Sequence, residues 1–347
     1  MALFGRKKTT IGLDVGSGLV KIAVMDHSTR TPELVRVAIV PLLADAIVEG
    51  EVMDPGIVAD AIRAALDAAG NPKGALVAAV GGRDVIVKKI LIERVKEQEA
   101  RQLMRFEAEQ HVPFDMASVQ MDFQILDPDD NTPEMSVLLV AAKQDLVASR
   151  MQLLSDANVT PDIIDVDAFA LHNAFELNHP EGMKGVVTLV NVGHEVTNVN
   201  ILDDGVPVLT RDIPLGTRRF REELQRERGL GADDAATLLE GFDRSPHLDA
   251  VIATKGEELA SGIERAIAFL ASSARAGNQV GVVYLSGGGA RIPGLIDWLA
   301  QRLRLRVVLA NPLANVTVRE GALDLLVMDE VAPLLMLPIG LALRQPS

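Results

Sequence analysis

A group of acidic, basic, glycine and hydroxyl residues stands close to the N-terminus, where the sequence DVGSGLVK begins at Asp14. Gly16 allows the backbone of a turn to approach a ligand closely, and Ser17 and Gly18 add backbone N–H groups and a hydroxyl. Lys21 returns along the following strand and supplies a positive charge for phosphate oxygens. The Asp14 carboxylate, at the end of the preceding strand, is placed to hold Mg²⁺ through water. The spacing predicts a phosphate-binding turn, although it does not match the GxxxxGK pattern of P-loops.

The same pattern returns near the middle of the chain. Residues 11–26 (IGLDVGSGLVKIAVMD) and 188–203 (TLVNVGHEVTNVNILD) each read as an apolar strand, a glycine turn and an alternating second strand. An offset of 177 residues, from 14 to 191, places Asn191 over the aspartate of the first copy. Gly193 and Thr197 then belong to a turn of the same geometry. A repeat at half the chain length indicates two lobes of common design, and a chance match between two short hairpins is the alternative.

A triple glycine follows a further apolar strand in the segment VYLSGGGARIPGL. The free N–H groups at the start of the next helix favour anionic or polar ligands. We therefore expect Gly287, Gly288, Gly289 and Arg291 to contact such a ligand, while a purely structural tight turn is the alternative for the glycines. Two phosphate-type hairpins and this turn, in this order in one chain, favour the functional interpretation.

The order of strands and helices predicts an α/β chain of two lobes, with a β-α-β-β-α subdomain inserted into the first. A helix starts at Pro55 and stops at Gly70, and the strand SVQMDFQIL alternates strictly between apolar and polar residues. The predicted units are a first lobe (9–84), the inserted subdomain (85–160), a return to the first lobe with a linking helix (161–183), a second lobe (184–340) with a helical segment (216–260), and a C-terminal end (341–347).

Composition excludes several classes of function. The 347 residues carry a net charge of −14 with 3% aromatic residues, which argues against nucleic acid as a partner. The absence of cysteine excludes disulfides and thiolate metal sites, and the six histidines lack the spacing of a metal site. His194 is expected to face solvent at the tip of its turn. No segment is long and apolar enough to span a bilayer, and no signal peptide is recognisable, so we expect a cytoplasmic protein.

The conjunction of motifs resembles the ATPase superfamily of actin and the heat-shock chaperones. GLDVGSGLVK resembles its first phosphate motif, TLVNVGHEVTNVNI its second, and VYLSGGGARIPGL its adenosine motif. The resemblance implies a two-lobed actin-like ATPase fold that binds ATP and Mg²⁺ between the lobes. Asp167 stands where chaperones carry a glutamate on the first connecting helix. Thr217, also an expected nucleotide contact, begins a segment that departs from the GGN-type opening of the superfamily.

Shorter strings are similar to the PilM family of type IV pilus assembly. These strings are FEAEQHVPF, IDVDAFAL and PIGLALR, and the inserted block falls where FtsA, the cell-division relative of actin, carries its own special subdomain, the SHS2 domain. The resemblance implies a scaffold at the inner face of the cytoplasmic membrane. Its implied partner is a PilN-like inner-membrane protein, whose N-terminal peptide lies in a groove between the first lobe and the inserted subdomain. Other pilus assembly components and a homo-oligomer are further implied partners.

One departure bears on catalysis. The second phosphate motif of the superfamily opens with Asp, whereas this chain has Asn191. Asp14 and Asp167 remain the candidate catalytic carboxylates, so we expect tight ATP binding and slow hydrolysis at most. The alternatives are an FtsA-like filament-forming protein, a small-molecule kinase of the same superfamily and the cytoplasmic half of a type II secretion protein. No amphipathic C-terminal tail, general-base carboxylate for a sugar or transmembrane helix supports them.

Overall fold

A computed structural model describes residues 8–128, 132–241, 244–273 and 279–346 of the chain. The first lobe forms around the predicted N-terminal hairpin, and its first helix begins where the side chain of Asp54 accepts a hydrogen bond of 3.0 Å from the N–H of Ile57. Its elements are β1 (Thr9–Val15), β2 (Leu19–Asp26), β3 (Glu33–Pro41), β4 (Ile47–Val48), β5 (Glu51–Val52), α1 (Pro55–Ala68), β6 (Ala75–Val80), β10 (Ile163–Val166) and α4 (Asp167–Asn178).

The second lobe repeats the plan of the first. Its elements are η2 (Pro180–Met183), β11 (Val186–Val192), β12 (Thr197–Asp203), β13 (Val206–Ile213), α5 (Thr217–Arg228), α6 (Ala232–Glu240), α7 (Pro246–Val251), η3 (Ile252–Gly256), α8 (Glu257–Ser273), β14 (Val280–Ser286), η4 (Gly288–Arg291), α9 (Leu295–Leu303) and β15 (Arg306–Leu309). Its sheet runs β13-β12-β11-β14-β15, and the first sheet contains the equivalent order β3-β2-β1-β6-β10. In both, the hairpin is antiparallel and the two following strands are parallel to its first strand. The internal repeat therefore marks two lobes with one topology.

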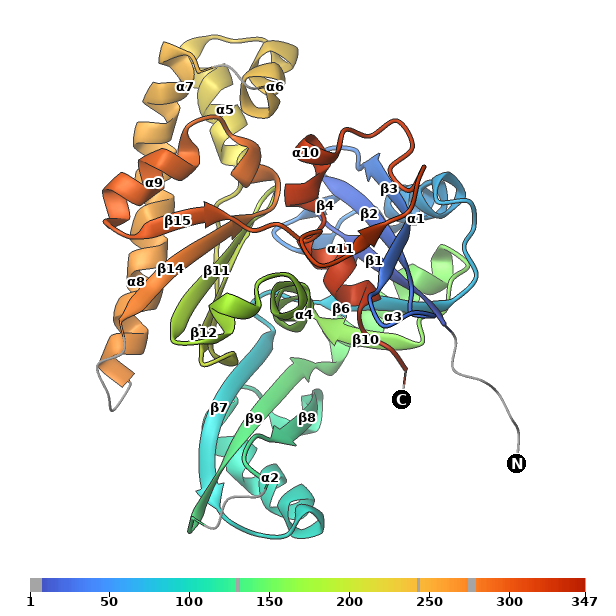
Figure 1. The fold of residues 1–347 in the computed structure, drawn as a ribbon, viewed down its shortest axis with the longest axis vertical. Helices are drawn as coiled ribbons and strands as arrows, with labels where there is room; N and C mark the ends of the chain where they lie inside the picture. The colour runs from blue at the N-terminus through green and yellow to red at the C-terminus, as the bar shows by residue number, and fades with distance from the viewer. Residues whose placement is uncertain (1–7, 129–131, 242–243, 274–278, 347) are drawn as a thin grey trace.

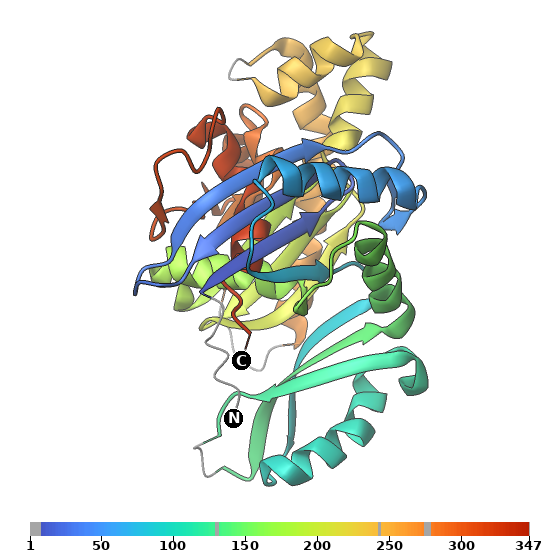
Figure 2. The same ribbon diagram turned by 90° about the vertical axis from the view of Figure 1, so that its right-hand side faces the viewer.

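The inserted subdomain is a three-stranded antiparallel sheet that projects away from both lobes (Figures 1 and 2). Its segment comprises β7 (Val85–Glu93), α2 (Glu97–His111), η1 (Met116–Ser118), β8 (Val119–Ile125), β9 (Glu134–Lys143) and α3 (Gln144–Asp156). Helix α2 covers one face of the sheet. The predicted limit of 160 includes α3 in the insertion, whereas Leu153, Leu154 and Ala157 pack in the core of the first lobe. Helix α3 thus joins the two units.

The C-terminal segment returns to the first lobe. It contains β16 (Thr317–Val318), α10 (Met328–Val331), η5 (Ala332–Leu334) and α11 (Met336–Ala342). Strand β16 pairs with β3, and α11 packs on β1 and α4, although the predicted second lobe runs to residue 340. Figure 1 shows α4 and α11 between the two sheets. Buried residues of these helices form one apolar core with residues of both sheets, which joins the two lobes; we call this core the base.

Close packing of α11 generates the first prediction. A Cβ at Gly340 would overlap the backbone of Ala170 in α4, so no side chain fits there without displacing a helix. Gly340→Ala is expected to lower the free energy of unfolding by about 2–3 kcal/mol, measured by urea denaturation.

The matched control is Gly281→Ala, on an exposed part of β14 where the nearest atom to a new Cβ lies at 3.8 Å. This variant is expected to stay within about 0.5 kcal/mol of the parent. Equal stability of the two variants would contradict the placement of α11.

Candidate functional site

The parallel strands of each sheet end at an edge that faces the other lobe. Asp14, Gly81 and Asp167 stand at or next to the ends of β1, β6 and β10, which pair in parallel. In the second lobe, Asn191 and Ser286 face each other as partners at the ends of β11 and β14. The carboxyl ends of such strands are the usual ligand-binding edge of an α/β sheet. These residues therefore lie at the strand ends of the two lobes, and we call the region between these ends the cleft.

The acidic and basic ends of the first motif meet directly. Asp14 and Lys21 are cross-strand partners in the hairpin, and Lys21 Nζ lies 2.6 Å from Asp14 Oδ2. Both side chains are mostly buried, at 10% and 14% exposure, so the pair is only weakly screened by solvent. Lys21, the cation predicted to bind phosphate, therefore lies beside the turn and is paired with the Asp14 carboxylate.

Both glycine turns are closed by the same internal hydrogen bond. The N–H of Gly16 donates to the carbonyl of Leu19 at 3.1 Å, and the N–H of Gly193 donates to that of Val196 at 3.0 Å. These two amides hold the turns in shape. The donors left for a ligand are those of the residues that follow each glycine.

The two turns touch across the cleft. A Cβ at Gly18 would lie 2.7 Å from Cγ of His194, so only glycine fits against that ring, and the neighbouring Ser17 is partly exposed. The expectation that His194 faces solvent is wrong, because its ring packs on Gly18 and its Nδ1 lies 3.3 Å from Thr217 Oγ1. Burial lowers the pKa of His194, which favours the neutral ring at pH 7. A ligand between the turns must displace this contact.

The two predicted threonines have different surroundings. Thr197 is fully buried, and its hydroxyl donates to the carbonyl of Leu215 at 2.7 Å, so the structure does not bring this hydroxyl to the cleft. Thr217 is the first residue of α5, and its N–H donates to the carbonyl of Gly193 at 3.0 Å. Thr217 therefore lies beside the second turn, as expected of a site residue.

A chain of amide contacts surrounds Asn191. The hydroxyl of Ser286 donates to Asn191 Oδ1, and Asn191 Nδ2 donates to Asn198 Oδ1, both at 3.3 Å. Asn198 in turn donates to Asp212 Oδ1 at 2.8 Å. Asp212 faces the first lobe, with Oδ2 4.0 Å from the Cβ position of Gly82, and burial raises its pKa. The sequence interpretation missed this carboxylate, whose only signal is its place at the end of a strand.

The triple glycine forms a turn between β14 and α9. Gly287 has a φ of +82°, and its N–H donates to the carbonyl of Pro333 at 2.7 Å. A Cβ at Gly289 would overlap Val192, so this glycine is required by packing, as in the structural alternative. Gly288 is half-buried near Thr217, where an added Cβ would make ordinary contacts. Arg291 is directed toward Glu240, at 3.9 Å.

Buried charges accumulate at the edge of the first sheet. Burial, followed by the nearby Asp14 carboxylate, raises the pKa of Asp167 to about 7, while Arg150 and Lys21 act in the opposite direction. Only glycine at position 81 leaves room for the Asp167 carboxylate. Arg150 comes from α3, which the sequence interpretation did not connect with the site.

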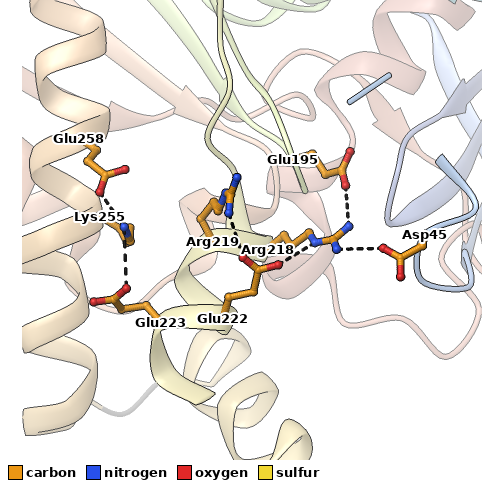
Figure 3. Close-up of polar contacts among 8 residues, drawn as sticks. All are labelled: Asp45, Glu195, Arg218, Arg219, Glu222, Glu223, Lys255 and Glu258. Atoms are coloured by element: carbon orange, nitrogen blue, oxygen red, sulfur yellow. Dashed lines mark hydrogen bonds and ion pairs between the residues drawn. The ribbon is translucent and has the colours of Figure 1, made fainter. Parts of the chain in front are cut away.

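A set of ion pairs links the lobes at the mouth of the cleft (Figure 3). Arg218 of α5 lies 2.8 Å from Glu195, 2.9 Å from Glu222 and 2.9 Å from Asp45, which belongs to the β3–β4 loop of the first lobe. Glu195 also accepts a hydrogen bond of 2.7 Å from the N–H of Glu49. The hydrogen bond to Glu222 is the main cause that raises the pKa of Arg218. We call the set Arg218, Glu195 and Asp45 the latch.

Within the described ranges, no group of three or more His, Cys, Asp or Glu side chains is arranged to hold a metal ion. Across the same part of the chain, no helix has the length and apolar character needed to cross a membrane.

Comparison with known proteins identifies similar chains. A family model described as "Type IV pilus assembly protein PilM" matches residues 12–346. A solved chain titled "PilM-PilN type IV pilus biogenesis complex" has 26% sequence identity and a TM-score of 0.84, with 98% of this chain and 99% of that chain covered. The ethanolamine utilization protein EutJ from Carboxydothermus hydrogenoformans has 13% identity and a TM-score of 0.54, with 96% and 89% covered. These likenesses confirm the predicted actin-like fold.

The latch generates the second prediction. Arg218→Met removes the ion pair with Asp45 that connects α5 to the first lobe, together with the pairs to Glu195 and Glu222. It is expected to lower the free energy of unfolding by about 1–2 kcal/mol and to speed hydrogen exchange in both turns, measured by denaturation and by exchange mass spectrometry.

Arg219→Met is the control, because Arg219 contacts Glu222 on its own helix at 3.3 Å and is 59% exposed. This variant should lower the free energy of unfolding by at most about 0.5 kcal/mol and leave hydrogen exchange in the turns unchanged. Equal exchange in the two variants would show that the latch does not hold the turns together.

Proposed function

The chain belongs to the PilM family of type IV pilus assembly proteins, and on this premise we propose that it is an ATP-binding scaffold that docks a PilN-like inner-membrane protein. The observation that carries the proposal is the match to the PilM-PilN complex chain, which extends over 98% of this chain at a TM-score of 0.84. At 26% identity it includes the inserted subdomain as well as both lobes. Docking on such a partner would hold the protein at the inner face of the cytoplasmic membrane.

The cleft between the lobes is suited to a nucleotide. Lys21 and the turn at Gly18 would hold the phosphates from the first lobe, and the turn at Gly193 from the second. The backbone at Gly288 would face the adenosine end. Asp14 would hold Mg²⁺ through water, and the ion would neutralise phosphate charge. Because His194 packs on Gly18, binding requires the two turns to separate.

The ion pair of the first hairpin gives the third prediction. Lys21→Ala removes a partly desolvated positive charge beside the turn, which should weaken ATP binding by about 1.5–3 kcal/mol in calorimetry.

Lys73→Ala is the control, since Lys73 is exposed and lies outside the cleft. A folded Lys21→Ala protein, verified by its thermal melt, that binds ATP as the parent does would remove this hairpin from the nucleotide site.

We propose that hydrolysis is slow because of Asn191. An amide can accept a hydrogen bond from metal-bound water, but it cannot act as a base. Asn191→Asp should therefore raise the steady-state rate of phosphate release at least tenfold at matched ATP occupancy.

Asn71→Asp adds the same charge at an exposed site on the first lobe and should not change the rate. Equal or slower turnover of Asn191→Asp would mean that another feature limits hydrolysis.

The proposed docking site for the partner peptide lies along the inserted subdomain. Two large apolar side chains are exposed there, Leu91 of β7 at 55% and Phe106 of α2 at 70%. Ile90 and Ile92 are buried under α2, so Leu91 points to the opposite face of the sheet. Phe106 is on the helix that covers the other face of the sheet, so the proposed docking surface rests on Leu91. An exposed apolar group on a rigid sheet is suited to an extended peptide.

Leu91→Asp tests this placement. It is expected to weaken binding of a synthetic peptide, matching the N-terminal residues of the PilN-like protein of the same organism, at least tenfold in calorimetry.

Leu325→Asp is the control, because Leu325 is 93% exposed and lies in the C-terminal segment, away from the inserted sheet. Full affinity of the Leu91 variant would move the docking site elsewhere, and no binding to the parent protein would refute the scaffold proposal itself.

A further inference from the structure

Arg150 stands in the middle of the buried face of α3. Leu146 and Val147, one turn earlier, pack in a small apolar cluster between the insertion and the first lobe. Leu153 and Leu154, one turn later, are in the core of the first lobe. Residues spaced by three and four positions share one helix face, so Arg150 belongs to the side of α3 that faces the lobe. An arginine on such a face needs a compensating environment.

That environment is the edge of the first sheet. The cluster around Leu146 contains Val80 and Val166, the residues directly before Gly81 and Asp167. The turn of α3 that carries Arg150 is therefore close to the strand ends at which the site is built. Burial lowers the pKa of Arg150, and the Asp167 and Asp14 carboxylates act in the opposite direction.

The Arg150 guanidinium has no ion-pair or hydrogen-bond partner among the described residues. Over the part of the chain that the structure describes, no hydrogen bond or ion pair within 4.0 Å joins Arg150 to Asp167, Asp14 or another side chain. The other cations at the cleft are engaged, Lys21 by Asp14 and Arg218 by the latch. Arginine presents five N–H donors in a planar fork that matches phosphate oxygens. The donors of Arg150 are available to an anion in the cleft.

We propose that Arg150 contacts the phosphate groups of the nucleotide bound in the cleft. This inference rests on the proposed nucleotide binding and assigns to it a residue from outside the known motifs of the sequence. Helix α3 starts on the inserted sheet, where Gln144 Nε2 donates to the carbonyls of Ala117 at 3.2 Å and Val119 at 3.3 Å. The phosphates would thus contact the helix that carries the peptide-docking subdomain.

The test compares ATP, ADP and adenosine as ligands of the full-length protein. Affinities are measured by competition against a fluorescent ATP analogue. Arg150→Met should weaken the binding of ATP at least tenfold and the binding of ADP less. Adenosine should bind as it does to the parent, because only the phosphates lose a contact. Arg150→Lys keeps the positive charge but lacks the planar fork of guanidinium donors. Its affinity for ATP should therefore lie between those of the parent and of Arg150→Met.

Arg63→Met is the control for an indirect effect through the position of α3 on the first lobe. The Arg63 guanidinium donates to the carbonyl of Asp156 at the end of α3, at 2.6 Å, and this residue lies outside the cleft. This variant should bind all three ligands as the parent does.

Three results would overturn the inference. Unchanged ATP affinity in Arg150→Met, or in Arg150→Lys if the first variant does not fold, would refute it while leaving nucleotide binding intact. An equal loss for ATP and adenosine would assign Arg150 a structural role. Failure of the parent protein to bind ATP would refute the proposed nucleotide function together with this inference.

Discussion

The contact between two matching glycine turns determines how the rest of the molecule can act. His194 packs on Gly18, and the ion pair of the latch between Arg218 and Asp45 links the two lobes at the mouth of the same cleft. At the base, α4 and α11 form one apolar core with both sheets. Dispersion and burial make the base hard to separate, whereas the mouth is held by the partly exposed ion pair of Arg218 with Asp45 and the hydrogen bond from Glu49 to Glu195. The lobes should therefore open at the mouth and pivot at the base.

The same geometry connects the cleft with the inserted subdomain. Helix α3 has its first residues on the inserted sheet and its last in the core of the first lobe. Arg150 lies between these ends, one turn after residues that pack with Val80 and Val166 at the strand edge. In the proposed scaffold, α3 connects the lobe that would bind the nucleotide with the subdomain on which the peptide would dock. That arrangement gives a physical route by which occupancy of one site can affect the other.

Local patterns predicted much of this structure. Alternating strands, the helix start at Pro55 and the glycine turns are properties of short segments, and the repeat of the hairpin revealed the second lobe. Features made by packing between distant segments were not predictable. The buried hydroxyl of Thr197, the carboxylate of Asp212 and the return of α11 to the first lobe depend on tertiary neighbours that no short pattern specifies.

The account is tested most directly by the distance between the lobes. The chain has no cysteine, so Ala64→Cys on α1 and Ala232→Cys on α6 give two unique sites for spin labels on exposed positions. Pulsed electron spin resonance then measures the distance with and without ATP and Mg²⁺. Opening at the mouth predicts a longer distance at saturating ATP, and Arg218→Met should shift the nucleotide-free protein in the same direction. An unchanged distance with ATP bound would contradict the claim that the turns must separate.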